Sequence, residues 1–393
     1  MEQWRKNLYA VWLMRLLAIM GTSLVFPFMT LYVRELGVLG EKAVTRWSGA
    51  AFSAAALASA IFSPIWGSVG DKYGRKLMIL RANFGMAITI TLMGLVKKVY
   101  QLVALRFLFG SLGGLLPASL ALVSTCVPKD RMGYALGLVQ TANFGGAIIA
   151  PLIGGALADL LGFRKVFFVT GALIFVGGLA CGPFLLETPL DRSEPRQSGV
   201  LRNVTFVASN PALLSIALCL LLVNFAMMVL QPIFPLYVER LGAPRDALAT
   251  TVGIIFSLAG FAVIASAPFW GKQTDKRGSR PTLIACLSGS GIFYALQSLA
   301  QTIYQLAPLR VLMGLFNGGV QPSTQAIVVH NSPESRRGGV IGITTSAGLI
   351  GSFLGPLTGG FLAAVIGMRA LFVFTGATLL ATALLIRRIG HGR

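Results

Sequence analysis

The sequence predicts an all-α integral membrane protein with twelve transmembrane helices, six in each of two related halves. Of the 393 residues, 55% are hydrophobic and only 12% are charged, a composition that cannot be buried inside a soluble protein of this length. Apolar stretches of about 20 residues recur along the chain, and a helix of this length crosses a hydrocarbon core of roughly 30 Å. A short basic segment with several glycines occurs twice, at 67–76 and 271–280, so the chain consists of two related halves.

The expected spans divide evenly around a polar segment in the middle of the chain. Residues 187–208 carry several charges and prolines and lack the apolar pattern of their neighbours. We therefore predict an N-terminal bundle at 1–186, a cytoplasmic linker on the membrane surface at 187–208, and a C-terminal bundle at 209–393. The expected spans are 8–33, 47–68, 77–96, 101–125, 134–158 and 165–186, then 209–234, 248–270, 282–300, 305–328, 339–362 and 369–388.

The basic residues predict the orientation of the chain. If the N-terminus is cytoplasmic, the cytoplasmic segments hold most of the lysines and arginines that lie outside the spans, as the positive-inside rule requires. Both termini are then cytoplasmic. The net charge of +20 is spread over many short loops, so it indicates contact with anionic membrane lipid and not with nucleic acid. The four cysteines lie far apart without a CxxC pair, and they predict neither a disulfide nor a metal site.

The repeated basic loop is the first candidate functional feature. In each copy an acidic residue stands near the end of one span, and basic residues stand at the start of the next. An ion pair between such residues across the bundle interface would hold one conformation of the protein. The alternative is that the basic residues only anchor the loops at the cytoplasmic surface. The predicted conformational latch comprises Gly67, Asp71, Gly74, Arg75, Lys76, Asp275 and Arg280.

Small residues recur at helical spacing around a proline in the fifth span and again in the eleventh. Glycines spaced in this way let helix backbones approach closely, while a proline bends the helix and frees a carbonyl group. Tight packing between helices is therefore expected here, whatever else these segments do. The residues are Gly146, Pro151, Gly154 and Gly155 in the fifth span, and Gly351, Gly355 and Pro356 in the eleventh.

Arginines within the spans are candidates for coupling or for charge in a central cavity, because a charge inside a membrane is costly without a partner or water. Arg106 and Arg310 occupy corresponding places in the fourth and tenth spans, and Arg15 lies deeper, in the first. Each of them either binds a ligand or a partner, or extends its side chain to the membrane surface. No Asp or Glu falls in the middle third of a span. The sequence therefore does not identify the residue that would carry a proton, although His330 lies at the inner end of the tenth span.

A cavity with arginines and without a central acid favours neutral, zwitterionic or anionic amphiphiles over permanent cations. Polar and adaptable apolar side chains on several spans are candidates for its lining, with ordinary helix packing as the alternative. They are Phe26, Asn143, Asn224, Met227, Met228, Gln231, Asn317, Gln321 and Gln325.

Three of these features resemble motifs of the major facilitator superfamily. The loop at Asp71 resembles the loop between the second and third helices of that family, the fifth span resembles the motif of its exporters, and the fourth span resembles a motif with an arginine before a glycine-rich stretch. Two positions depart from the family pattern, since Ser279 replaces an arginine and Ala150 replaces a glycine. The resemblance covers nearly the whole chain and implies two six-helix bundles that rock around a central cavity.

Within that superfamily the chain resembles the multidrug-efflux branch that exchanges drugs for protons, for example at 62–67, 74–78 and 164–168. The resemblance implies a monomer in the bacterial inner membrane that exports toxic amphiphiles by alternating access and so contributes to antibiotic resistance. Its partners would be a small-molecule substrate, protons and membrane lipid, without a cofactor. The alternative is an importer or exchanger of organic anions that binds its substrate through membrane-embedded arginines. An enzyme is not expected, because the sequence has neither a nucleophile elbow nor a nucleotide-binding loop.

Overall fold

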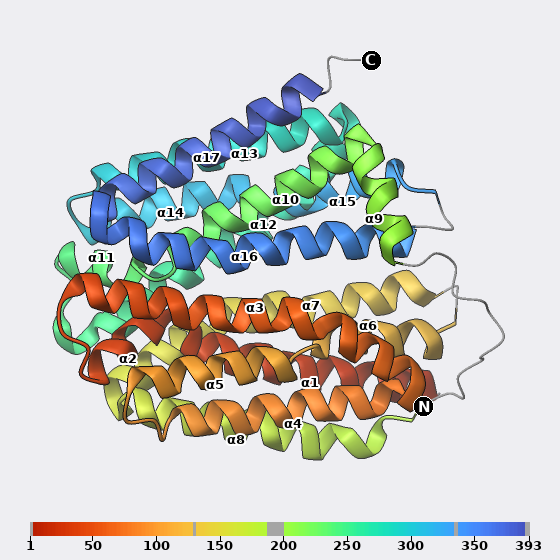
Figure 1. The fold of residues 1–393 in the computed structure, drawn as a ribbon, viewed down its shortest axis with the longest axis horizontal. Coiled ribbons are helices and arrows are strands. Elements are labelled where there is room, and N and C mark those ends of the chain that lie inside the picture. Colours follow the sequence, from red (N-terminus) through yellow and green to blue (C-terminus); the bar gives the residue numbers. More distant parts are fainter. Residues whose placement is uncertain (1–2, 129–130, 187–199, 334–336, 390–393) are drawn as a thin grey trace. The chain divides into compact units, whose positions relative to one another are not determined.

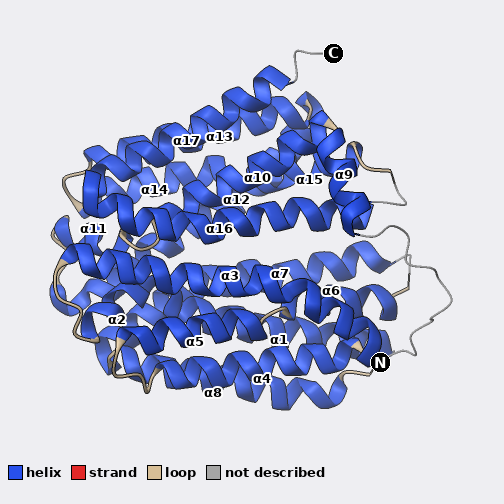
Figure 2. Cartoon of the chain, in the orientation of Figure 1, coloured by secondary structure: helices blue, strands red, loops and turns tan. Residues whose placement is uncertain are grey.

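The computed structural model describes residues 3–128, 131–186, 200–333 and 337–389. These residues form helices joined by short connections, and no β-strand occurs among them (Figures 1 and 2). The predicted all-α class is confirmed. The helices are α1 (Gln3–Val25), η1 (Phe26–Phe28), α2 (Met29–Glu35), α3 (Glu41–Tyr73), α4 (Arg75–Met93), α5 (Val99–Leu112), α6 (Leu115–Cys126), α7 (Met132–Leu161), α8 (Phe163–Cys181), η3 (Gly182–Phe184), α9 (Val200–Ser209), α10 (Pro211–Val229), α11 (Phe234–Arg240), η4 (Arg245–Ala247), α12 (Leu248–Arg277), α13 (Ser279–Leu296), η5 (Gln297–Leu299), α14 (Ile303–Asn317), α15 (Val320–His330), α16 (Arg337–Ile366) and α17 (Met368–Ile389).

Within the described residues, 10 helical segments are long and apolar enough to cross a membrane. They coincide with expected spans in both halves of the chain. The two remaining expected spans fall on α3, which has 33 residues, and on α14 together with α15. The described helices therefore occupy all twelve expected spans, six in each half of the sequence, and ten of them are long and apolar enough to cross a membrane.

Two of the expected spans are interrupted by a pair of glycines. The fourth consists of α5 and α6, which meet at Gly113 and Gly114, and the tenth consists of α14 and α15, which meet at Gly318 and Gly319. Gly114 has a φ of 101°, a conformation that residues with a Cβ atom rarely adopt. The apolar pattern does not reveal such a break, because glycine is also frequent inside unbroken transmembrane helices.

The chain groups into two compact units that do not coincide with the two halves of the sequence. The first part of α3 belongs with helices of the second half, and the first part of α12 belongs with helices of the first half. The beginnings of these two long helices therefore contact helices from the other half of the sequence. Unit 1 comprises Met1–Leu39, Ala54–Arg192 and Pro244–Ser257, and unit 2 comprises Gly40–Ser53, Ser193–Ala243 and Leu258–Arg393.

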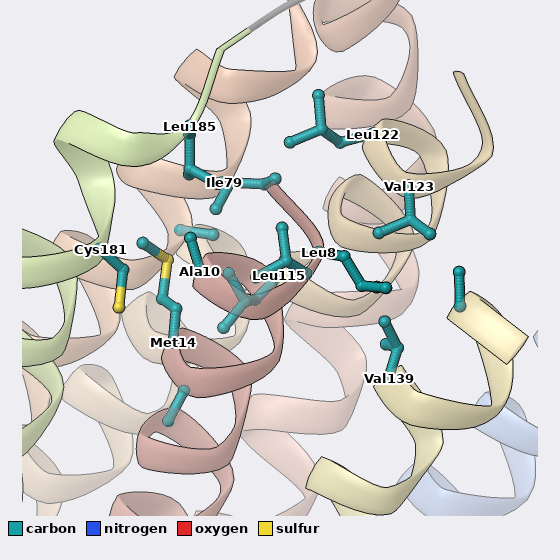
Figure 3. Packing of buried hydrophobic residues seen from close by; sticks show 14 of the residues in the cluster. Leu8, Ala10, Met14, Ile79, Leu115, Leu122, Val123, Val139, Cys181 and Leu185 are labelled. Carbon is teal, nitrogen blue, oxygen red and sulfur yellow. The ribbon is translucent and has the colours of Figure 1, made fainter. Parts of the chain in front are cut away.

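A cluster of buried apolar side chains holds α1 inside unit 1 (Figure 3). Leu8 and Met14 of α1 are each 1% exposed, and α4, α6, α7 and α8 contribute further side chains to the cluster, such as Ile79 and Val139. Because lipid tails are as apolar as these side chains, close packing stabilises the cluster more than removal from water does. The cluster fixes the part of α1 that carries Arg15, which follows Met14 directly.

Candidate functional site

The glycine and proline motif of the fifth span lies on α7 and faces two helices. Toward α1, a Cβ atom at Gly146 would lie 2.9 Å from the side chain of Ile19, and a Cβ atom at Gly154 would overlap the carbonyl oxygen of Leu24. A residue with a side chain at either position would force the two helices apart. This face of the motif therefore holds α7 against α1, as small residues do at helix contacts in membranes.

The other face of the motif forms a seam with α12, within unit 1. Each helix presents a glycine to the backbone of the other, since a Cβ atom at Gly155 would overlap the carbonyl oxygen of Ala249, and one at Gly253 would overlap that of Pro151. The two backbones are thus in direct contact. We call this contact the α7–α12 seam; it comprises Ile148, Pro151, Gly155 and Asp159 of α7 with Ala249, Thr250, Gly253 and Ser257 of α12.

Hydrogen bonds tie both ends of the α7–α12 seam. At one end, the Ser257 hydroxyl donates to the carbonyl oxygen of Ile148 at 2.6 Å. At the other end, the carboxylate oxygens of Asp159 accept the backbone N–H groups of Ala249 at 3.1 Å and Thr250 at 2.7 Å. These two N–H groups lie in the first turn of α12, where backbone donors have no partner within the helix. Asp159 of α7 therefore caps α12 from outside that helix.

The motif of the eleventh span forms an equivalent seam between α16 and the first part of α3, within unit 2. Gly49 lies against the carbonyl oxygen of Pro356, and a Cβ atom at Gly360 would lie 2.5 Å from the carbonyl oxygen of Thr45. A serine hydroxyl of α3 donates a hydrogen bond of 2.7 Å to a backbone carbonyl group of α16. We call this contact the α3–α16 seam; it comprises Thr45, Gly49 and Ser53 of α3 with Phe353, Pro356 and Gly360 of α16.

Further glycines of α16 face α10 and hold these two helices together. Two of the expected cavity residues lie in this contact, because a Cβ atom at Gly348 would lie 3.1 Å from the amide nitrogen of Asn224, and one at Gly355 would lie 2.8 Å from the Cβ atom of Met228. Asn224 also donates to the carbonyl oxygen of Leu220 at 2.8 Å. For these two residues the geometry is that of helix packing. The α16 glycines whose Cβ atoms would meet the α10 backbone are Gly351, Gly355 and Gly359.

Arg15 is the centre of a buried polar group between α1 and α7. The residue is 2% exposed, and its Nη2 atom donates a hydrogen bond to the side-chain oxygen of Asn143. The Asn143 amide in turn donates to Gln140 at 2.6 Å, and Trp12, one turn before Arg15, donates to Thr141 at 3.0 Å. The structure thus joins two residues that the sequence proposed separately, one as a cavity charge and one as a substrate contact.

One hydrogen-bond donor of this polar group lacks an acceptor. The Nε atom of Arg15 is enclosed and has no hydrogen-bond partner in the described part of the protein, and no ion pair of Arg15 occurs there either. A buried guanidinium that lacks a counter-charge is unfavourable unless an acceptor is supplied from elsewhere. The described neighbours of Arg15 therefore compensate its buried charge only in part.

Each copy of the basic loop is reduced to a single glycine between two helices. Gly74, with a φ of 104°, separates α3 from α4, and Gly278, with a φ of 88°, separates α12 from α13. A residue with a Cβ atom would be strained at both places. The sharp turn between the two helices therefore explains why both copies of the loop have a glycine at this position.

The ionic part of the predicted latch stays a prediction. The Nη1 atom of Arg75 donates to the carbonyl oxygen of Ala121 at 2.6 Å, while the side chain of Asp71 lies outside the described residues. Asp275 is exposed, and it forms no ion pair with any residue that the structure describes. Of the remaining members, Lys76 and Arg280 are half-buried and Gly67 has open space beside it.

Arg106 and Arg310 are buried inside their helix bundles. They are 8% and 7% exposed, and their guanidinium carbons lie 5.5 Å and 3.8 Å from the ring centres of Phe109 and Phe234. Cation–π contacts of this kind compensate part of the lost hydration of a guanidinium group. Both side chains are held within the protein and are not extended to its surface.

The other expected cavity residues lie on several elements. Phe26 is half-buried in η1 of unit 1, and the others belong to unit 2. The amide oxygen of Gln231 is enclosed and has no hydrogen-bond partner among the described residues. This oxygen could therefore accept a hydrogen bond from a ligand. Met227 and Asn317 are half-buried on α10 and α14, and Gln321 and Gln325 are exposed on α15.

Comparison with known proteins decides the family. Residues 11–251 and 245–391 both match the Major Facilitator Superfamily. The chain belongs to this superfamily. Its members are membrane transporters. Relatives include the "Multidrug resistance protein MdtG" of Dickeya zeae, which is 39% identical over 384 residues that cover 97% of this chain and 93% of the relative, and that of Salmonella typhimurium, which is 40% identical over 382 residues that cover 97% and 94%.

Solved structures of other superfamily members share the fold. One is a bacterial homologue of the human lysosomal transporter Spinster in an inward-facing and occupied conformation, with a TM-score of 0.81, 17% identity, and coverage of 100% of this chain and 98% of that one. Another is the nucleoside transporter NupG, with a TM-score of 0.80, 12% identity, and coverage of 98% and 99%. Sequence identities this low show the architecture and not the substrate.

Several residues of this superfamily member were not identified as functional candidates from the sequence. The spacing of the motifs points neither to the glycines and serines that α3 and α12 bring to the seams nor to Asp159 of α7. A signal for the former was present, because Ser53 and Ser257 are separated by the same number of residues as Asp71 and Asp275. Aligning the two halves along their whole length, and not only at the motifs, reveals these residues.

Proposed function

We propose that this protein exports small amphiphilic toxic compounds from a bacterial cell by alternating access, in exchange for protons. The observation that carries the proposal is the match, over 97% of the chain, to relatives named multidrug resistance proteins. The sequence has no nucleotide-binding loop, so an ion gradient is the energy source in this proposal. The protein is a monomer in the inner membrane, and both of its termini are cytoplasmic.

In this proposal the two seams form the gate on the outer side of the membrane. With cytoplasmic termini, α7 and α16 end at the outer surface, and α3 and α12 begin there. Each seam joins a helix of the N-terminal bundle, at 1–186, to a helix of the C-terminal bundle, at 209–393. Both seams must open to release a compound outward and must close again before the next one is taken up inside.

Arg15 provides the charge of the substrate site. Its guanidinium is buried and is oriented by Asn143, while its enclosed Nε atom has no acceptor in the described part of the chain. A substrate that supplies an acceptor there removes the cost of an unsatisfied buried donor. We therefore expect anionic, zwitterionic and neutral amphiphiles to bind better than permanent cations.

The test uses inverted membrane vesicles with an acidic interior, to which an anionic, a neutral and a cationic amphiphile are added in turn. We expect the anionic and neutral compounds to dissipate the proton gradient through the wild-type protein. Arg15→Gln should raise the half-maximal concentration of the anionic compound about tenfold, which corresponds to about 1.4 kcal/mol, and should change that of the neutral compound little. The exposed Lys97 provides the charge-matched control, Lys97→Gln, which should change neither value.

An exchanger of organic anions is the second candidate, and the burial of Arg15 is the observation that favours it. The two candidates differ in whether protons move. If no compound dissipates the gradient while an external anion drives the exit of a labelled anion loaded inside the vesicles, the exchanger replaces the exporter. A response to the cationic amphiphile alone would contradict the role given to Arg15.

A further inference from the structure

A cavity of about 200 Å³ lies inside unit 1 among α3, α4 and α6, and it contains none of the seam residues. Its wall combines apolar groups with two guanidinium groups, those of Arg75 and Arg81. Trp66 and Met78 form further parts of the wall. Among the side chains that the structure describes, no acidic one lines this cavity. The described lining of this small cavity is therefore partly apolar and carries two cationic groups.

Arg81 is held in a fixed position in this wall but is not satisfied there. Its guanidinium carbon lies 3.6 Å from the ring centre of Trp66, and its Nη2 atom donates to the carbonyl oxygen of Gly113 at 2.9 Å. The Nε and Nη1 atoms are enclosed, and they have no hydrogen-bond partner in the described residues. Buried donors of a charged group rarely remain without an acceptor, and an unseen ion is a common explanation.

The second half of the sequence shows that the fold itself does not require this arginine. Trp270 corresponds to Trp66, and the two indole N–H groups donate to equivalent carbonyl oxygens, of Leu315 at 2.6 Å and Ser111 at 2.5 Å. Arg81 and Ala285 correspond, because Arg81 follows Trp66 by the same number of residues as Ala285 follows Trp270. The same tryptophan scaffold therefore forms without a charged partner.

The space beside Trp270 is filled by close packing. A Cβ atom at Gly319 would lie 2.7 Å from the Cγ atom of Trp270 and would overlap the sulfur of Cys286. In the first half, Gly114 precedes α6 as Gly319 precedes α15, and its Cβ position has one described neighbour within 4 Å, the Nη2 atom of Arg81 at 3.6 Å. The shared scaffold thus forms with alanine in place of this arginine, which indicates a use of Arg81 other than stabilising that scaffold.

We propose that this cavity binds the phosphate group of an anionic ligand, with Arg81 as its main donor and Arg75 beside it. The guanidinium group of Arg81 keeps two nitrogens, Nε and Nη1, without an acceptor, and the ionised oxygens of a phosphate group are strong acceptors for such charged donors. The phosphate belongs either to a phospholipid headgroup or to a free phosphate compound. Tyr73 and Leu77, which are 61% and 53% exposed next to Arg75 in the sequence, provide an apolar surface for the chains of a lipid.

The experiment measures the unfolding temperature of the purified full-length protein in a nonionic detergent. One arm adds phosphatidylglycerol, with diacylglycerol of the same chains as the control that lacks phosphate. The other arm adds sodium phosphate, with sodium chloride of equal ionic strength as the control. We expect one phosphate-containing addition to raise the unfolding temperature by about 2–4 °C, and its control to have no effect. A response to the lipid identifies a headgroup site, and a response to sodium phosphate identifies a site for free phosphate.

Variants assign the effect to the cavity. Arg81→Gln should abolish the rise, while the charge-matched Lys97→Gln on an exposed connection should keep it. Arg81→Lys retains the charge but lacks the planar guanidinium group with its several donors, so it should keep less than half of the rise in unfolding temperature. It provides a second variant if Arg81→Gln does not fold. The proposal is overturned if neither addition stabilises the wild type, or if Arg81→Lys retains the full rise. Because no transported substrate is used, these outcomes do not depend on the export proposal.

Discussion

The α7–α12 seam and the α3–α16 seam are built from the same parts. In each, a serine hydroxyl donates to a carbonyl group of the motif helix, at 2.6 Å from Ser257 and at 2.7 Å from Ser53. In each, a glycine of α12 or α3 lies against the proline carbonyl group of the motif helix. A glycine of the motif helix in turn lies against a backbone carbonyl group of α12 or α3. Position by position these residues are related by the internal repeat. The duplication has therefore preserved the backbone contact itself.

The seams differ in charge. Asp159 caps the beginning of α12 with two hydrogen bonds, whereas the repeat places Ala364 at the corresponding position of α16. Near the α3–α16 seam, Arg240 pairs with Glu41, but their side chains are 59% and 40% exposed, and exposed pairs of this kind contribute little. A cap by an ionised acid contributes about 1–2 kcal/mol. Both seams thus close through the same backbone contacts, and the carboxylate of Asp159 makes the α7–α12 seam the stronger one.

The largest effect is expected when the shared geometry is broken. Gly155→Ala and Gly360→Ala each place a Cβ atom against backbone of the facing helix, and overpacking of this kind costs about 1–3 kcal/mol. The transport rate of both variants in inverted vesicles should be at least about tenfold lower than that of the wild type, because the helix backbones no longer meet. Equal losses would confirm that the seams are equivalent in geometry.

Matched controls exist on the same two helices. Gly137 of α7 and Gly342 of α16 are also related by the repeat, and nothing lies within 4 Å of a Cβ atom at either. Gly137→Ala and Gly342→Ala should therefore transport at nearly the wild-type rate. If they lose as much as the seam variants, the loss reflects helix flexibility and the seam contacts are not its cause.

A smaller effect is expected from removing the charge that distinguishes the seams. Asp159→Ala should weaken the α7–α12 seam by about 1–2 kcal/mol, which lowers the ratio of closed to open protein roughly 5–30-fold. The measurement is the labelling rate of a Thr250→Cys variant by an impermeant maleimide added outside intact cells, since Thr250 lies at the start of α12. Asp159→Asn keeps a neutral acceptor and should give a smaller increase in labelling.

The reciprocal change sharpens this comparison. Ala364→Asp gives α16 a carboxylate at the position where α7 has Asp159, so it should restore part of the closure lost in Asp159→Ala. The labelling rate of the double variant should then lie between that of Asp159→Ala and that of the parent. An unchanged labelling rate in Asp159→Ala itself would show that the cap does not hold the seam closed.

The sequence predicts much of this architecture for physical reasons that act locally. Span length and apolar character follow from the thickness of the bilayer, and the membership of Gly155, Gly360 and their neighbours in close contacts follows from the small size of glycine. The confirmed fold class and family rest on such signals. The breaks at Gly113–Gly114 and Gly318–Gly319 were not predicted, because a glycine in an apolar stretch is compatible with both a helix and its interruption.

The candidate sites were harder to predict, because their contacts join positions far apart in sequence. Arg15 was identified by the cost of a charge within a span, but its partner Asn143 depends on which faces of α1 and α7 meet. Arg81 was counted only as a basic residue, although Trp66 and Gly113 give it a fixed place. The sequence of one helix does not determine which neighbouring helix its side chains face. Contacts such as that of Arg15 with Asn143 therefore become known only from the structure.

The smallest effect is expected from the paired serines. Ser257→Ala and Ser53→Ala each remove one hydroxyl-to-carbonyl hydrogen bond. Such bonds between helices in membranes contribute about 0.6 kcal/mol on average, so each variant should lower transport by a factor of about 3 or less, and the two losses should agree within the error of the assay. Because the acceptor is a backbone carbonyl group in both seams, neither loss should change with the substrate used. A loss confined to Ser257→Ala would mean that the α7–α12 seam opens at a different step from the α3–α16 seam, and the shared geometry would then not imply a shared role.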